Sequence, residues 1–150
     1  MHIEIRKAQL SDCNTIVRFQ EAIAWETESL KLDRDTVRNG VNSVLNNEAL
    51  GIYYVAVINN GVAGSLLTTY EWSDWRNGTV IWIQSVYVNP AYRKKGIYKA
   101  LYNHIKSMVE KDESLIGIRL YVDESNRSAH EVYTRLGMNG DHYRVFEWMK

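Results

Sequence analysis

The sequence has little of several features that mark common classes of protein. Among its 150 residues there is one cysteine and one proline, and 18 Lys and Arg balance 18 Asp and Glu. A lone cysteine, Cys13, cannot form an internal disulfide, which is typical of a protein from a reducing compartment. The single proline excludes a Pro-rich linker, and the balanced charge argues against a general nucleic-acid binder.

Long hydrophobic runs are also missing. No stretch approaches the roughly 20 apolar residues that a membrane span requires, and the first residues, MHIEIRKAQL, lack the apolar core of a signal peptide. We therefore expect a cytoplasmic protein that binds neither membrane nor nucleic acid. One domain is the default at this length, and without repeats or an internal boundary we expect a single domain over residues 1–150.

Metal-ligand and nucleophile patterns are absent as well. The four histidines, at positions 2, 104, 130 and 142, form no zinc-binding spacing. Cys13 has no histidine near it in the sequence, and the sequence contains no serine elbow, P-loop or dinucleotide-binding glycine motif. We therefore expect no metal and no covalent catalysis by Cys13.

Hydrophobic periodicity predicts both strands and helices. The expected strands are 2–7, 52–58, 62–70, 79–88, 115–122 and 142–148, and the expected helices begin near positions 11, 33, 97 and 126. Asp33 is the expected cap of the second helix, Ser125 or Asn126 that of the last helix, and Gly137 its expected end. Asn60-Gly61 and Asn77-Gly78 indicate turns between antiparallel strands. The strand–helix–strand unit over 79–122 needs a crossover, so its two strands should be parallel.

The resulting fold class is α/β, or more narrowly α+β. We expect a mixed, mostly antiparallel sheet of about six strands with helices on both faces, in the order β-α-α-β-β-β-α-β-α-β. Such a fold carries no function by itself.

The sharpest local feature is a basic turn between a strand and a helix. Asn89-Pro90 ends the strand, and Arg93-Lys94-Lys95-Gly96 precedes the helix that begins at Ile97. Backbone N–H groups and the helix dipole favour an anion at such a helix start, and a glycine lets a phosphate approach the backbone closely. A solvated basic turn would present the same residues, so the turn alone leaves both interpretations open.

The turn resembles a known signature. Residues 93–98 are similar to the pyrophosphate-binding R/Q-x-x-G-x-G/A motif of the GNAT family of N-acetyltransferases. Asn126, Ala129 and Tyr133, followed by Leu136-Gly137-Met138, resemble that family's second conserved segment. The resemblance is specific from about Val80 to Met138. It departs from the family at Tyr98, where Gly or Ala is usual, and the tyrosine ring either crowds the pyrophosphate or points away from it.

The resemblance implies an acyl-CoA site between the two parallel strands, opened by a bulge near Gln84 or Ser85. Backbone groups of Val86 and Val88 would bind the pantetheine, and the Val86 N–H would polarise the thioester carbonyl and stabilise its oxyanion. The other expected cofactor-binding residues are Arg93, Lys94, Lys95, Gly96, Ile97, Tyr98, Asn126, Ala129 and Tyr133.

The resemblance also indicates a general acid. Tyr133 would give a proton to the departing thiolate, since a phenol keeps its proton at neutral pH. From the residues alone, a core position beside Val132 and Leu136 is the favoured interpretation of Tyr133, and the resemblance reverses this preference. The general base stays open among Glu28, Glu71, Asp74 and Gln84, of which Gln84 would only orient water.

The acceptor side is expected at the segment 25–32, which loses the helical period and is expected to be a loop, and at the connection 71–78. Both are acidic and aromatic, which suits a cationic amine, although solvated acids and packed indoles would read the same way. The expected acceptor-binding residues are Trp25, Glu28, Glu71, Asp74, Trp75 and Tyr143. The expected function is transfer of an acetyl group from acetyl-CoA to a primary amine, on a small molecule or a peptide, in a ternary complex. The alternative is an acyl-CoA sensor with little turnover. Members of the family often dimerise, so a homodimer is also an expectation.

Overall fold

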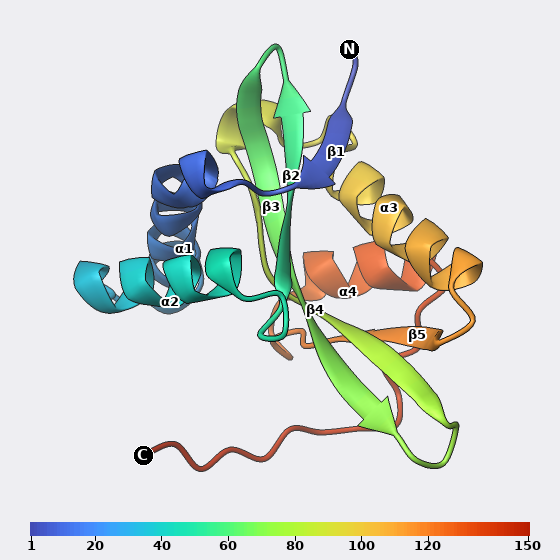
Figure 1. Cartoon of the computed structure of the whole chain (residues 1–150). Coiled ribbons are helices and arrows are strands. Elements are labelled where there is room, and N and C mark those ends of the chain that lie inside the picture. Colours follow the sequence, from blue (N-terminus) through green and yellow to red (C-terminus); the bar gives the residue numbers. More distant parts are fainter. The chain divides into compact units, whose positions relative to one another are not determined.

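The computed structural model describes residues 1–150 and divides into two compact units, Met1–Leu120 and Tyr121–Lys150. The first unit holds the sheet and three helices, and the second holds one helix (Figure 1). The expectation of a single domain stays a prediction.

The first unit is built on a five-stranded mixed sheet. Its strands are β1 (Glu4–Lys7), β2 (Ile52–Ile58), β3 (Gly61–Ser73), β4 (Gly78–Val88) and β5 (Leu115–Leu120), and they lie in sequence order. All neighbours are antiparallel except β4 and β5, which are parallel because helix α3 (Ile97–Lys111) connects them. The mixed, mostly antiparallel α+β sheet is therefore confirmed.

Both predicted hairpins form, with shifted turns. The left-handed residues between β2 and β3 are Asn59 and Asn60, with φ of 48° and 65°, and Gly61 is already the first residue of β3. The β3–β4 hairpin is longer than expected, because Ser73 pairs with Gly78. A Cβ on Gly78 would lie 2.4 Å from the side chain of Ile116, so this position requires glycine for packing.

Helices cover both faces of the sheet, as predicted. Helices α1 (Cys13–Glu28) and α2 (Arg34–Asn46) pack on one face and α3 on the other (Figure 1). The core under α1 and α2 includes Ile16, Val41, Val55 and Leu67. The predicted cap of α2 is confirmed, since the Asp33 carboxylate accepts a hydrogen bond from the Thr36 N–H at 2.9 Å.

The second unit contains α4 (Arg127–Arg135). Asn126 caps it by accepting a hydrogen bond from the Ala129 N–H at 3.1 Å, and Gly137, with φ of 86°, follows its end, both as predicted.

The expected last strand over His142–Trp148 is wrong. The segment has no regular structure, and it includes Phe146, which is 96% exposed. Its alternating pattern describes which side chains would share a face, but a strand exists only where a neighbouring strand pairs with it. The sheet therefore has five strands and not six. No helix of either unit is long and apolar enough to cross a bilayer.

Candidate active site

The bulge expected in β4 is present. Leu67 pairs with Gln84 and Ser65 pairs with Tyr87, so an advance of two residues along β3 lies opposite an advance of three residues along β4. The bulge includes Ser85, whose backbone is left-handed with φ of 54°. Such a bulge bends its strand and increases the local twist.

The bulge coincides with the point where β4 and β5 part. Their pairing ends at Ile83 and Leu120, whereas β4 continues to Val88. From Gln84 onward β4 is therefore paired with β3 alone, and its other edge carries backbone groups without a neighbouring strand. Val86 and Val88 lie on this edge. An extended amide chain is the natural occupant of such an edge, because it can continue the ladder of hydrogen bonds.

The edge leads directly into the basic turn. Residues Pro90–Tyr92 form a short 3-10 turn, and Gly96 caps α3 with φ of 81°. No side chain caps the first N–H groups of α3, and a Cβ built on Gly96 would meet no atom within 4 Å. The amides at the start of a 15-residue helix thus face open space, which is the geometry of an anion site.

The guanidinium of Arg93 is held by the protein itself. Its Nε donates to the Val88 carbonyl at 2.9 Å, and a terminal nitrogen donates to Glu26 Oε2 at 2.8 Å. It also lies 5.4 Å from the centre of the Tyr87 ring, whose hydroxyl donates to Glu26 Oε1 at 3.3 Å. Burial, with Glu26 as a lesser cause, raises the pKa of Tyr87 above its ordinary value, so the phenol keeps its proton.

The other residues of the turn divide between backbone and packing roles. Lys95 folds back to donate to the Ala91 carbonyl at 3.1 Å, and Lys94 adopts a left-handed φ of 61°. Ile97 is buried at 2% exposure. The ring of Tyr98 lies beside that of Tyr102, one helical turn along α3, with 6.4 Å between centroids. The ring thus packs along the helix.

A strip of polar side chains lies on the sheet face that α1 and α2 partly cover. Thr69 and Glu71 follow the core residue Leu67 at alternate positions of β3, so all three share a face. Gln84 donates to the Thr69 hydroxyl at 3.1 Å, and Glu71 is ion-paired with Arg119 of β5 across β4. Gln84 is therefore at the bulge, while Glu71 is occupied as the partner of Arg119.

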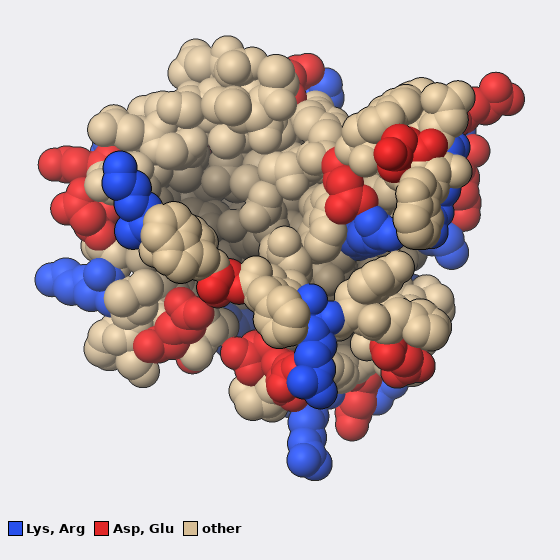
Figure 2. Space-filling model, turned by 90° about the horizontal axis from the view of Figure 1, so that it is seen from below, with Lys and Arg blue, Asp and Glu red and all other residues tan.

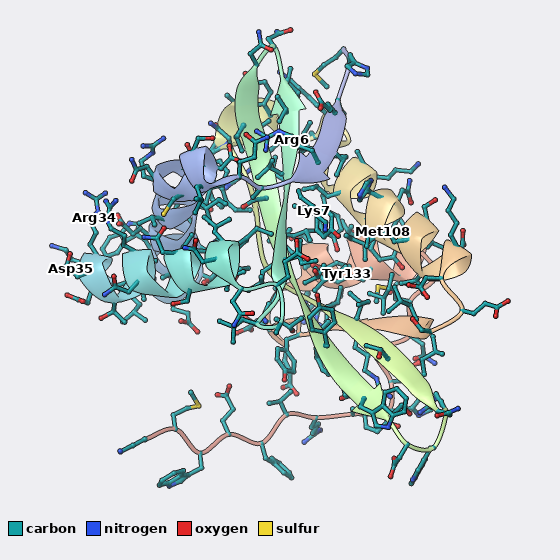
Figure 3. The ribbon with its side chains drawn as sticks, viewed as in Figure 1. Arg6, Lys7, Arg34, Asp35, Met108 and Tyr133 are labelled. Atoms are coloured by element: carbon teal, nitrogen blue, oxygen red, sulfur yellow. The ribbon has the colours of Figure 1, made fainter.

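The stretch 25–32 is only partly a loop. Residues 25–28 form the last turn of α1, which ends at Ser29 with φ of 52°, so the expectation of an irregular segment from Trp25 onward is wrong. The helical pattern was hidden because exposed residues dominate this turn. Trp25, at 63% exposure, lines an open groove of about 400 Å³. The other lining residues are Glu21, Leu30, Lys31, Leu32 and Arg34, and Glu28 is not among them. Figure 3 labels Arg34, which starts α2 and pairs with Glu21 at 2.8 Å.

Half of the expected connection 71–78 is strand, which corrects the prediction. Glu71 belongs to β3 and Gly78 to β4, which leaves 74–77 as the turn. Asp74 accepts a hydrogen bond from the Trp75 N–H at 2.9 Å, and the Trp75 indole is 91% exposed. These two residues thus lie at a hairpin tip, whereas Trp25 lies on a helix and Glu71 on the sheet face.

The remaining predicted residues belong to the second unit. Ala129 and Tyr133 occupy the half-buried side of α4, one turn apart, and Figure 3 labels Tyr133 on that helix. Tyr143 is 81% exposed in the irregular segment that follows. We predicted that Tyr133 contacts the ligand at the β4 edge and that Tyr143 contacts the acceptor. Both stay predictions.

Charge on the surface is mixed. Figure 2 shows Lys and Arg interspersed with Asp and Glu, without a broad area of one sign. His, Cys, Asp and Glu side chains nowhere gather in a group of three that would suit a metal ion.

Sequence reasoning missed the two long-range ion pairs of the site. Glu26 and Arg93 are 67 positions apart, and Glu71 and Arg119 are 48 apart. No local pattern marks such pairs. The acidic last turn of α1 and the basic turn at 93–95 were both visible, but only the fold shows that one faces the other.

The geometry fits a coenzyme A thioester. The open edge of β4 suits the amide-bearing pantetheine arm, and the open space in front of Gly96 suits a pyrophosphate. Both lie on one continuous segment, 84–97, so one extended ligand can contact them together.

Comparison with known proteins agrees with this fit. Residues 10–138 match the model of the acetyltransferase (GNAT) family. A possible acetyltransferase from Clostridium difficile 630 is 43% identical, with a TM-score of 0.93 over 100% of this chain and 99% of that one.

More distant structures share the fold. A predicted acetyltransferase from Clostridium acetobutylicum, crystallised with acetyl-CoA, is 18% identical over 97% of this chain and 96% of that one, with a TM-score of 0.75. A ribosomal-protein-alanine N-acetyltransferase from Brucella melitensis is 15% identical over 99% of this chain and 100% of that one, with a TM-score of 0.80. Among curated proteins the sequence has no match. From the family match and the 43% identical structure, the chain belongs to the acetyltransferase (GNAT) family.

Proposed function

We propose that the protein transfers the acetyl group of acetyl-CoA to a primary amine, directly and within a ternary complex. The observation that carries the proposal is the continuous segment from the bulge at Ser85 to the glycine cap at Gly96. It combines an open strand edge, which suits the pantetheine arm of coenzyme A, with an uncapped helix start, which suits its pyrophosphate.

Residues of β4 and the turn would hold the co-substrate. Val86 and the N–H of Val88, whose carbonyl already accepts from Arg93, would offer backbone groups to the pantetheine amides, and the amides of 94–98 would face the pyrophosphate. Lys94 adds positive charge beside it. When bound, acetyl-CoA supplies an activated thioester, so the chain itself needs no covalent nucleophile.

The chain's own residues would then assist the transfer in three ways. The Val86 N–H donates to the acetyl carbonyl oxygen, where negative charge develops as the amine attacks. The Tyr133 hydroxyl gives its proton to the sulfur as the carbon–sulfur bond breaks. Binding both partners side by side removes the entropy of their encounter.

The attacking amine must first lose a proton, and in this proposal Gln84 assists that step. Its side chain lies on the sheet face beside the bulge, bonded to Thr69. An amide has no basic group at neutral pH, so Gln84 would orient a water that carries the proton away. Glu71 also lies on this polar strip, but its carboxylate is already ion-paired with Arg119.

The acceptor is expected on the side of α1 and the β3–β4 hairpin. The Trp25 groove offers an apolar wall, and the exposed carboxylates of Glu28 and Asp74 offer charge for a cation. These groups come from separate elements, which favours an extended acceptor over a compact one.

The proposal is tested by incubating the protein with acetyl-CoA and a panel of amines. The panel contains an amino acid, a polyamine, an aminoglycoside and a short peptide. We expect release of free thiol that depends on one class of amine, together with a product that carries one acetyl group by mass spectrometry. Tight CoA binding in calorimetry without amine-dependent release would reject the transferase and identify a sensor.

A further inference from the structure

Arg93 occupies the first position of the cofactor turn, yet its side chain points to protein partners. Two of its nitrogens donate to Val88 and to Glu26, at 2.9 Å and 2.8 Å, and its guanidinium stacks on Tyr87. Three separate elements, α1, β4 and the turn, thus meet at one side chain. This arrangement gives Arg93 a different task from the amides beside it.

We propose that Arg93 is a positioning residue that braces the cofactor turn against the last turn of α1 through Glu26. The inference rests on the proposed function for the identity of the ligand. In this assignment the backbone N–H groups bind the pyrophosphate, and the guanidinium keeps them in place without touching it.

The turn needs such a brace because its backbone is strained. Lys94 has φ of 61°, a left-handed conformation that costs a non-glycine residue energy, and Gly96 follows with φ of 81°. Without an external hold, the turn would spend part of its time in relaxed conformations that misdirect the amides. Apparent affinity for the ligand falls in proportion to the population of the competent form.

Glu26 is suited to be the anchor. It lies within the last helical turn of α1, before Ser29, so its backbone is fixed. Its two oxygens are both occupied, one by Arg93 and the other by the Tyr87 hydroxyl at 3.3 Å. The Tyr87 ring in turn packs on Phe19 of α1, with 4.8 Å between centroids. The carboxylate is thus oriented by the core of the first unit.

The brace and direct phosphate contact predict opposite signs for one substitution. If Arg93 were a phosphate ligand, Glu26 would compete for it, and Glu26→Gln would tighten CoA binding. If Arg93 is a brace, Glu26→Gln weakens CoA binding by about two- to fivefold, the range expected for a half-exposed ion pair. The comparison is made by calorimetry with CoA at fixed salt.

Four further variants sharpen the test. Glu48→Gln is the matched control, because it removes the same charge and breaks an exposed ion pair, with Lys7 at 3.2 Å, outside α1 and the cofactor turn, and it should leave CoA affinity unchanged. Arg93→Lys should weaken binding as much as Arg93→Gln, because the planar fork is needed and a point charge does not replace it. The double variant Glu26→Gln with Arg93→Gln should be no weaker than Arg93→Gln alone.

A truncated ligand separates the turn from the rest of the site. S-acetylpantetheine lacks the pyrophosphate, so Glu26→Gln should not change its affinity. The side chains of Glu26 and Arg93 are both more than 40% exposed, so variants at these two positions should fold, and thermal melting checks this. As a second route to the same network, Tyr87→Phe keeps the ring and removes only the hydroxyl donor, and it should weaken CoA binding in the same direction by a smaller factor.

The results distinguish two failures. If the parent protein binds no CoA, the proposed function falls together with this inference. If the parent binds CoA and transfers acetyl groups while Glu26→Gln binds CoA as tightly as the parent or more tightly, only the brace is overturned.

Discussion

Replacement of Gly96 is the most direct test of the cofactor turn. Its φ of 81° is left-handed, and a Cβ at this position would meet nothing within 4 Å. A substitution therefore clashes with no atom of the free protein and costs only backbone strain, roughly 1–2 kcal/mol for alanine. At this chain length such a loss lowers the melting temperature by about 2–8 °C.

The effect on CoA binding should be larger than the effect on stability. The added atoms would fill the space in front of the α3 amides, where the phosphate has to approach. A hydrogen bond to a charged group contributes about 1.5–3 kcal/mol, so loss of one weakens binding roughly ten- to hundredfold. Gly96→Val should weaken CoA binding more than Gly96→Ala does, since a β-branched side chain is larger and fits a left-handed backbone less well.

The chain offers a matched control in Gly137. It follows α4 with φ of 86°, and a Cβ there would also meet nothing within 4 Å. Gly137→Ala should therefore cost similar stability and leave CoA affinity as in the parent. Thermal melting and calorimetry with CoA measure the two quantities separately. Equal CoA affinity for Gly96→Ala and Gly137→Ala would refute the assignment of the turn.

Three more predictions concern catalysis, the acceptor and pH. Tyr133→Phe should keep CoA affinity and lower the maximal rate by roughly 10²–10⁴-fold, and a rate within about twofold of the parent under chemistry-limited conditions would remove the phenol from the mechanism. Glu28→Gln and Asp74→Asn should each raise the Michaelis constant of a confirmed amine by up to about fivefold at low salt, because both carboxylates are exposed; a change confined to acetyl-CoA would contradict this. Burial, with Lys111 as a lesser cause, lowers the pKa of His104, so the fold prefers the neutral ring. Unfolding free energy in urea should therefore fall as pH drops below about 6.5, and His104→Gln should flatten that dependence.

Local sequence signals predicted most of the framework. Asp33 and Asn126 cap their helices as expected because a cap depends on a side chain and an amide three positions away. The turn at Asn59-Asn60 was predicted one residue late, since an Asn-Gly pair competes with an Asn-Asn pair for the same left-handed conformations. The last turn of α1 was missed because its residues are exposed and carry no apolar period.

Long-range pairing set the limit of prediction. The segment 142–148 has the alternation of a strand, yet strand formation depends on a partner that the segment's own residues do not specify. The bulge at Ser85 was predictable only because the resemblance to the family named its place. The ion pairs of Arg93 and Arg119 needed the register of the sheet, which brings together residues that are distant in sequence.

The role of Arg93 shows how the two kinds of information combine. As a letter in a motif, it stands next to a phosphate site and carries the right charge, so direct contact is the natural interpretation. In the fold, its donors already have acceptors in Val88 and Glu26, and redirecting them would leave the Glu26 carboxylate without its cation. The N–H groups at the start of α3 have no side-chain cap, so they can donate to the anion at no such cost. The motif therefore locates the anion site, while the contacts show which of its groups are available to bind.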